Sequence, residues 1–245
     1  MTFRLDLHVH TDASPDGRSS LADQAAAAKA AGLDAIAVTD HNLCTPVPPE
    51  LEGVLLIPGC EVSTTDGHII GLFLDAPLDL EGLRSGGLPT GARAVEEIRR
   101  RGGLAVLAHP YQSAKAAPEG FPFRPDAVET ANARAALKVR EANQKAERLA
   151  IDWALPAVGG SDAHSRREVG SAYTQVECME RTLSALKAAL LAGECRGVLV
   201  RDTAHIQKGL SQLAKAHRLG GGKRLAVALA YVACCAGRDL LRPFR

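Results

Sequence analysis

Short blocks that combine histidine with acidic residues recur along the chain, and each lies beside an apolar run typical of a β-strand. Six of the eight histidines of the 245-residue sequence lie in these blocks. In chain order the blocks are Asp6-Leu7-His8-Val9-His10, Thr39-Asp40-His41-Asn42, Glu61, Gly67-His68, Ala108-His109-Pro110 and Ser161-Asp162-Ala163-His164. Imidazole and carboxylate groups bind and activate divalent metals. The series therefore predicts strands that end at one polynuclear metal site, as in a hydrolase.

The spacing inside two blocks supports this interpretation. His8 and His10 are two residues apart, so on a strand their imidazoles point to the same face while Val9 points to the other. Asp162 and His164 repeat that spacing. An HxH pair by itself is a weak signal, and each block alone also fits an ordinary buried histidine or a solvated carboxylate. The ordered series is what indicates a metal site.

Strand-like and helix-like patterns alternate along the chain. Expected strands are Phe3–His8, Ala35–Thr39, Val54–Ile57, Ile69–Leu74, Leu104–Ala108, Ala127–Glu129 and Ala154–Val158. Expected helices are Ser20–Ala31, a helix from Thr90 to Arg101, Ala133–Ala150 and Thr182–Ala192, with a Gly-rich loop over Gly82–Gly91. Repeated strand–helix units predict a parallel sheet covered by helices. A closed barrel is favoured because candidate ligands follow nearly every strand, and a ring brings them to one mouth.

These blocks, in this order, resemble the motifs of the PHP (polymerase and histidinol phosphatase) family of metal-dependent phosphoesterases. The resemblance covers residues 3 to 176, and the stretch from Val128-Glu129 to Tyr173-Thr174 resembles the PHP-associated segment of many bacterial members. It implies an α/β fold, a distorted (βα)7 TIM-like barrel with the metal site at the carboxyl ends of the strands. We expect residues 1–200 to form this unit and residues 201–245 to form a basic helical extension.

The resemblance also implies how nine residues share two or three divalent ions, with Mn, Fe or Zn as candidates. The first ion would be held by His8, His10, Glu61 and Asp162. Glu61 would bridge to a second ion held by His68 and His109, and Asp16, His41 and His164 would hold a third. Asp12 is an alternative to Asp16, because both follow the first strand.

The expected reaction is hydrolysis of a phosphate ester, in a small phosphorylated metabolite or a nucleotide, by metal-activated hydroxide. Asp40, Arg134 and Arg166 are candidate catalytic residues. Guanidinium groups suit phosphate oxygens, although solvated surface arginines are equally compatible with the sequence. Asp6 and Asp40 precede ligands and suit a role in orienting imidazoles.

Two other functions fit part of the pattern. Metal-dependent amidohydrolases also begin with HxH, but a glutamate stands here at the bridging position and no lysine is available for a bridging carbamate. A non-catalytic PHP-like module would bind metal for structural or regulatory purposes. A complete set of nine ligands argues against that alternative.

Charge is unevenly distributed along the chain. The net charge of +1 argues against a stable nucleic-acid complex, yet residues 201–245 hold nine Lys/Arg and two Asp, a local charge of +7. Within them Leu225–Ala236 is a 12-residue apolar run, too short to span a bilayer. We expect it to pack on the barrel or to self-associate, with contact between residues 223–245 and a membrane surface as the alternative. The lack of a signal pattern and of CxxC pairs among six cysteines predicts a cytoplasmic protein with reduced thiols.

Overall fold

The computed structural model describes residues 1–112, 122–139 and 141–241. Helices and strands alternate along most of the chain. They are β1 (Thr2–Val9), α1 (Leu21–Ala30), β2 (Ala35–Val38), β3 (Glu50–Leu51), β4 (Val54–Thr64), β5 (Gly67–Leu72), α2 (Leu80–Arg84), α3 (Gly91–Arg100), β6 (Leu104–Ala108), β7 (Ala127–Asn132), α4 (Ala133–Lys138), α5 (Ala142–Asp152), β8 (Ala157–Gly160), β9 (Ala172–Glu177), α6 (Leu183–Leu191), β10 (Cys195–Leu199), α7 (His205–Leu219) and α8 (Gly222–Leu240).

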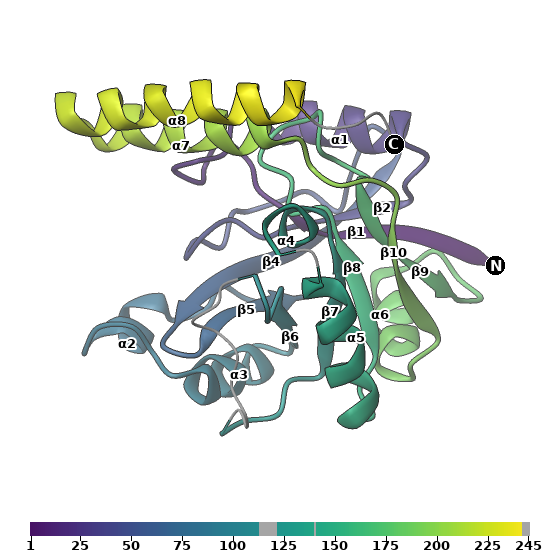
Figure 1. The fold of residues 1–245 in the computed structure, drawn as a ribbon. Helices are drawn as coiled ribbons and strands as arrows, with labels where there is room; N and C mark the ends of the chain where they lie inside the picture. Colours follow the sequence, from purple (N-terminus) through teal and green to yellow (C-terminus); the bar gives the residue numbers. More distant parts are fainter. Residues whose placement is uncertain (113–121, 140, 242–245) are drawn as a thin grey trace.

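The strands form one strongly curved sheet that nearly closes on itself (Figure 1). Its order is β10-β9-β1-β2-β4-β5-β6-β7-β8, with β3 beside β4. The chain just after β8 returns to β1, where the Ala163 N–H donates to the His8 carbonyl at 3.2 Å and the His10 N–H donates to the Ala163 carbonyl at 2.8 Å. The predicted α/β barrel is thereby confirmed.

The strand directions are mixed, so the prediction of a parallel sheet was wrong for part of the barrel. β1, β2 and β4 are parallel, as are β6, β7 and β8, but β5 runs antiparallel to both β4 and β6. Only two residues separate β4 from β5, and a parallel pair needs a crossover of a dozen residues or more. The strands β9 and β10, which the sequence patterns did not predict, add a further antiparallel pair beside β1.

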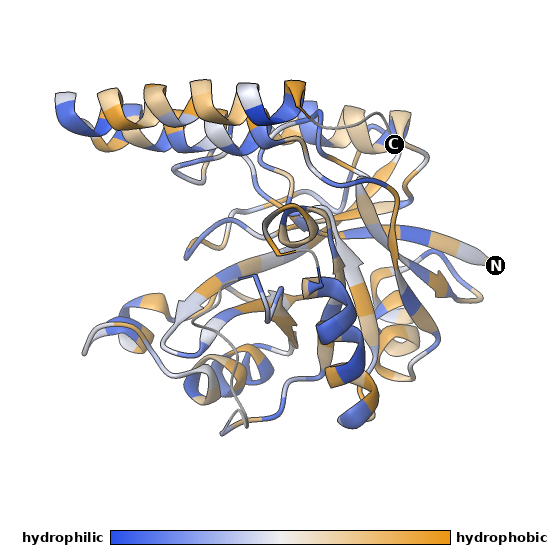
Figure 2. Ribbon diagram, viewed as in Figure 1, coloured by the Kyte–Doolittle hydropathy of each residue, from blue (hydrophilic) through white to orange (hydrophobic). Residues whose placement is uncertain are grey.

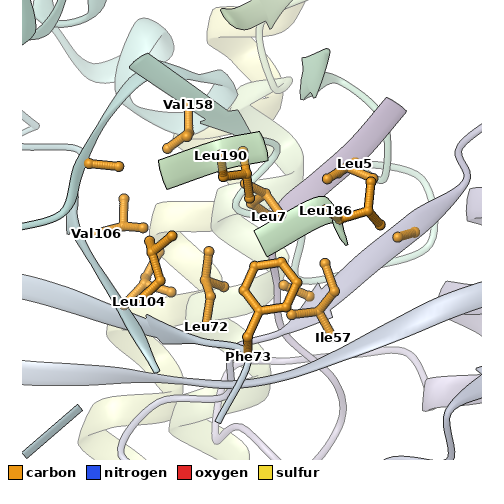
Figure 3. Packing of buried hydrophobic residues seen from close by; sticks show 14 of the residues in the cluster. Leu5, Leu7, Ile57, Leu72, Phe73, Leu104, Val106, Val158, Leu186 and Leu190 are labelled. Carbon is orange, nitrogen blue, oxygen red and sulfur yellow. The ribbon is translucent and has the colours of Figure 1, made fainter. Parts of the chain in front are cut away.

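The barrel interior is filled by apolar side chains from strands on all sides (Figure 3). Leu5 and Leu7 of β1, Leu72 of β5 and Leu104 of β6 are almost fully buried there. α6 contributes the fully buried Leu186 and Leu190 to the same cluster. This packed interior is the rigid base on which the strand ends are held.

A register irregularity in β1 decides which side chains reach the barrel mouth. The pairing between β1 and β2 shifts between Asp6 and Val9, as at a β-bulge. Leu7 lies in the interior cluster with Phe3 and Leu5, as alternation predicts, whereas beyond the shift Val9 packs on the other side with residues such as Ala28 of α1. Strict alternation would place His8 on the face opposite Leu7. The bulge re-aims His8 toward the mouth.

Several helices begin where the sequence ranges predicted. The side chains of Ser20, Thr90 and Thr182 accept the N–H groups of Asp23, Arg93 and Ala185, so α1, α3 and α6 begin as expected. The single helix expected over Ala133–Ala150 is instead two, because Val139 is extended between α4 and α5. The loop expected over Gly82–Gly91 contains part of α2, which Asp79 caps through the Gly82 N–H.

The helices α7 and α8 form an antiparallel hairpin that crosses one side of the barrel and extends past it (Figure 1). Arg218 of α7 donates to the carbonyls of Asp12 and Ser14, and Arg134 donates to Ser211 Oγ at 3.0 Å. Figure 2 colours much of α8 as hydrophobic although the helix lies at the surface. Among the described residues, no helix combines the length and the apolar character needed to cross a bilayer.

Candidate metal centre

Glu61 lies at the centre of a cluster of imidazoles. The residue is fully buried within β4, and its carboxylate oxygens lie 2.6–3.6 Å from ring nitrogens of five histidines. The shortest of these distances join Oε2 to His41 Nδ1, at 2.6 Å, and Oε1 to His68 Nδ1, at 2.7 Å. Although β5 runs antiparallel, His68 reaches the cluster because its strand starts at the edge where its neighbours end. Imidazoles from four strand–loop segments, those of β1, β2, β5 and β6, thus converge on one carboxylate of β4.

The predicted ligands lie close enough together to share ions. Three groups made up only of predicted ligands have ligand atoms that all lie within 4.8 Å of one another: His8, His10 and Asp162; Glu61, His68 and His109; and His10, His41 and His164. A fourth such group joins His8 and His109 to Glu129. The first group contains the residues expected to hold the first ion except Glu61. The second group is the full set expected for the second ion. The third contains two of the three residues expected for the third ion. The first and third groups share His10, and Glu61 of the second group lies 3.5–3.6 Å from His10 and His8 of the first, as expected of a polynuclear site.

Asp16 completes the third group. Its Oδ1 lies 3.6 Å from His41 Nε2 and 3.7 Å from His164 Nε2. The alternative carboxylate, Asp12, is exposed, whereas Asp16 is almost fully buried. The structure therefore brings all nine predicted ligand residues together and favours Asp16 over Asp12.

Two of these residues have an unusual backbone conformation. His109 and Asp162 have positive φ angles of 27° and 56°. Positive φ is unfavourable for residues other than glycine and is found at sites where the surroundings impose it. The His109 N–H is held by a hydrogen bond of 2.8 Å to Glu129 Oε2. Strand geometry alone does not aim these two side chains, so the strain is part of how the cluster is assembled.

Glu129 is a site residue that sequence reasoning missed. It lies within β7, and its Oε1 is 3.0 Å from His8 Nδ1. Asn132 donates to its Oε2 at 2.9 Å, so both carboxylate oxygens have partners. A carboxylate on Nδ1 fixes the imidazole ring and leaves Nε2 to face the other ligands. The available signal was an acidic residue within an otherwise apolar strand.

Asp6 and Asp40 form hydrogen bonds with backbone N–H groups and hydroxyls of the site rather than with its imidazoles. Asp6 accepts the N–H groups of Ser161 and Gly170, at 2.8 and 3.0 Å. Asp40 accepts hydrogen bonds from Thr11, Ser14 and Thr45. Only Ser14 continues to an imidazole, with its Oγ 3.3 Å from His10 Nδ1. The influence of Asp40 on a predicted ligand is therefore indirect.

Burial and mutual charge control the protonation of the cluster. Burial opposes ionisation of Glu61 and Asp162, but the surrounding imidazoles outweigh it and hold the pKa of each carboxyl well below its ordinary value. For His41, burial is outweighed by Glu61, Asp16 and Asp162, which raise its pKa to about 9. Burial and two neighbouring imidazoles lower the pKa of His10 to about 3. The cluster combines ionised carboxylates with a neutral imidazole, both of which are ligand forms.

Unpartnered polar atoms show that divalent cations suit this cluster. Asp16 Oδ1, Glu61 Oε2 and His68 Nδ1 are buried and have no partner in hydrogen-bond geometry, although Glu61 lies close to imidazole nitrogens. Buried lone pairs without partners are costly. Histidine and carboxylate donors without a thiolate match the ligand preferences of Mn, Fe and Zn. The donor set therefore fits the metal ions that the sequence predicted.

A pocket of about 540 Å³ opens over the cluster. Predicted ligands line it together with Arg84, Arg134, Lys208, Gln212 and Lys215, while His8, His10 and Glu61 are fully buried. The last three lining residues belong to α7, and Lys215 Nζ lies 3.7 Å from Asp16 Oδ2. Sequence reasoning missed these contributions of α7, because nothing local indicates that the extension reaches the barrel mouth.

The two arginines predicted as catalytic occupy different places. Arg134 is buried at the pocket wall and pairs with Glu168 at 2.7 Å. Arg166 lies outside the pocket: its side chain is 66% exposed and lies 3.5 Å from Asp23. Arg166 directly follows the turn that presents His164 to the cluster, but its side chain points away.

Comparisons with known proteins give a consistent result. Residues 6–90 match the model of the PHP domain, and residues 140–195 match the model of the PHP-associated family. These two ranges include eight of the nine predicted ligands; His109 lies between them.

Two uncharacterized proteins of Methanocaldococcus jannaschii are similar to the chain. MJ1587 is 34% identical over 124 residues, which are 44% of this chain and 68% of that protein. MJ0417 is 31% identical over 186 residues, which are 70% of this chain and 69% of that protein.

A solved structure shares the fold. It is a two-domain protein from Bacteroides vulgatus that contains a predicted PHP-like metal-dependent phosphoesterase, with a TM-score of 0.58 and 21% identity. The match covers 81% of this chain and 65% of that chain, so this chain spans less than two thirds of its length.

Proposed function

This chain belongs to the PHP-domain family, and from that premise we propose that it is a metal-dependent phosphoesterase that hydrolyses a small phosphorylated metabolite or a nucleotide. The observation that carries the proposal is the combination of a polynuclear ligand cluster with a cationic pocket wall. Overlapping histidine–carboxylate groups lie at the bottom of the pocket, and Arg84, Arg134, Lys208 and Lys215 line it. Metal ligands and cations together suit a phosphate group.

Two or three ions, of Mn, Fe or Zn, would be held by the nine residues in the sets that the sequence predicted. Such ions supply Lewis acidity, which lowers the pKa of water and offsets phosphate charge. The protein's part is to hold the ligands in place. Glu129 orients His8, and Asp40 orients the loop of His10 through Ser14.

Side chains at the pocket wall would orient the substrate. Lys215 lies beside Asp16 and offers a cationic ammonium to a phosphate oxygen at the edge of the cluster. Arg134 is fixed by Glu168 and Ser211, so its guanidinium is a preorganised part of the wall. Arg166 is outside this proposal because of its distant, exposed side chain.

The test is phosphate monoester hydrolysis by protein reconstituted separately with Mn, Fe(II) and Zn, with elemental analysis of each preparation. The His8→Ala/His10→Ala variant should lose bound metal and turnover together. The matched control is His217→Ala, which removes an exposed histidine of α7 outside the site.

The alternatives give different results. Bound ions with cleavage of amides but of no phosphate ester would favour an amidohydrolase, and bound ions without any turnover would favour a metal-binding module. Protein that binds no divalent ion under any of the three conditions would refute the proposal.

A further inference from the structure

A second cavity, of about 590 Å³, lies between α7 and α8. Its lining is mainly apolar and includes Leu219, Val227 and Tyr231. Two of these side chains are unusually exposed for their type, Leu219 at 56% and Val227 at 70%. Apolar surface of this kind in a hollow indicates a binding site.

The cavity adjoins the pocket over the metal centre. Gln212 and Lys215 line both. Lys208, Gln212, Lys215 and Leu219 follow one another at intervals of three or four residues, so they form one face of α7. This face leads from the ligand cluster, where Lys215 contacts Asp16, to the apolar hollow.

The charges around the cavity are of one sign. Lys215, Lys223 and Arg224 are among its lining residues. A second copy of the chain docked here would bring the same cations with it, and like charges at an interface are unfavourable. An anionic molecule with an apolar part matches both properties of the surface. Because Lys215 lines both the cavity and the pocket over the metal centre, the anionic end of such a molecule fits on the side of the cavity next to that pocket.

We propose that the cavity between α7 and α8 binds the apolar leaving group of an amphiphilic phosphate monoester, whose phosphate reaches the metal centre. This inference rests on the proposed phosphoesterase function and narrows its substrate class. It gives the hairpin, which lies beyond both family-model matches, the role of selecting substrates by their apolar part.

The first experiment compares ethyl phosphate with hexyl phosphate, both as monomers in solution. Both are primary alkyl esters, so their intrinsic reactivities are alike and a difference in kcat/KM reports binding of the chain. Hexyl phosphate has four more methylenes than ethyl phosphate, and their binding in the cavity should raise kcat/KM by about thirtyfold. This is less than complete burial of the methylenes would give, because the cavity is partly open to solvent.

The second experiment changes the cavity without changing charge. Leu219→Gln/Val227→Gln makes its lining polar and should bring the two esters within about threefold of each other, because the apolar contact is lost. The matched control is Leu229→Gln/Leu240→Gln, which changes two exposed residues of α8 that do not line the cavity. The control should retain the full preference for hexyl phosphate.

A third measurement separates this inference from the phosphoesterase proposal. Calorimetry of hexylphosphonate and ethylphosphonate, which are not hydrolysed, reports binding without turnover. If hexylphosphonate binds more tightly than ethylphosphonate, and the Leu219→Gln/Val227→Gln variant loses this difference, the cavity binds the apolar chain. This conclusion would hold even if no ester were cleaved.

Other results would overturn the inference. If hydrolysis is intact but kcat/KM and phosphonate affinity are the same for both chain lengths, the cavity does not bind the apolar part of the substrate. The phosphoesterase proposal would then still stand. A dimer in light scattering that only the Leu219/Val227 variant dissociates, together with equal rates on the two esters, would assign the surface to a second copy.

Discussion

At the scale of single residues, the centre depends on one carboxylate. Glu61 approaches five imidazoles within 3.6 Å, and its pKa is held well below the ordinary range, so it is ionised at neutral pH. A glutamine of the same size would remove this negative charge from the centre of the imidazole cluster. Glu61 is therefore the residue whose replacement should affect metal binding most.

We expect Glu61→Gln to weaken metal binding by more than about 100-fold, beyond the 10- to 100-fold effect of losing an outer partner of a ligand. Competition with a chelator and elemental analysis measure this loss. Glu96→Gln, at an exposed position of α3, is the matched control and should bind metal normally. Unchanged affinity in Glu61→Gln would show that this carboxylate is not a ligand.

His41 should make metal binding depend on pH. Its pKa is raised to about 9, so in the metal-free protein it is protonated at neutral pH. An ion must displace that proton, so affinity should rise about tenfold per pH unit up to about pH 9 if one proton is released. Calorimetry in buffers of different ionisation enthalpy counts the protons. A flat affinity between pH 6 and 9 would contradict the expectation.

The same shift predicts how the metal-free fold responds to pH. A histidine whose folded pKa is raised stabilises the fold fully below its ordinary value of 6.5. That contribution is lost as the pH rises through about 9. As the pH rises toward 9, the free energy of unfolding should therefore fall for the metal-free protein, whereas the affinity of the protein for metal should rise.

At the scale of elements, the barrel closes because glycines permit close approach. A Cβ on Gly160 of β8 would lie 2.4 Å from His8 Cβ and 2.7 Å from His8 N. The neighbouring Gly159 is equally confined, with a Cβ position 2.7 Å from the Tyr173 carbonyl oxygen. β8 can thus lie against β1 and β9 only without side chains at these two positions.

Gly160→Ala should separate β8 from β1 and displace His8. We expect a loss of about 3 kcal/mol in the free energy of unfolding, at the upper end for overpacking, because the clash is with backbone as well as side chain. Urea unfolding of the metal-free protein measures it. Gly86→Ala is the control, since its Cβ would meet open space. A similar stability for both variants would show that the barrel closes by another arrangement.

At the scale of the whole molecule, the metal centre joins distant parts of the chain. Its predicted ligands come from β1, β4 and β5 and from the segments that follow β1, β2, β6 and β8. An ion that binds only the folded state stabilises all of these connections together. At 100 times its Kd it should contribute about 2.7 kcal/mol.

Removal of metal should therefore lower Tm by about 5 to 10 °C in a chain of this size. Differential scanning calorimetry with and without a chelator checks this value, and His217→Ala should show the same difference as the unmodified protein. If the chelator has no effect on Tm in a preparation proven to contain metal, the ions do not hold the strands together.

Local sequence patterns, together with the family resemblance, predict the barrel class and the histidine–carboxylate composition of the candidate centre. The blocks around His8, His41 and His109 are local in the chain, and each lies beside an apolar run whose hydrophobicity can be read from that run alone. Residue type, spacing within a block and the order of the blocks therefore predict the nine candidate ligands, but not the other side chains at the barrel mouth. The helix caps at Ser20, Thr90 and Thr182 are local in the same sense.

The tertiary structure decided what depends on pairing between distant segments. The antiparallel direction of β5, the strands β9 and β10, and the bulge that turns His8 toward the mouth depend on partners elsewhere in the chain. The hydrogen bond between Glu129 and His8 and the ion pair between Lys215 and Asp16 also depend on segments that are distant in the chain. A local pattern indicates which face of an element is apolar but not which distant element covers that face. Contacts between residues far apart in the sequence can therefore be identified only from the tertiary structure.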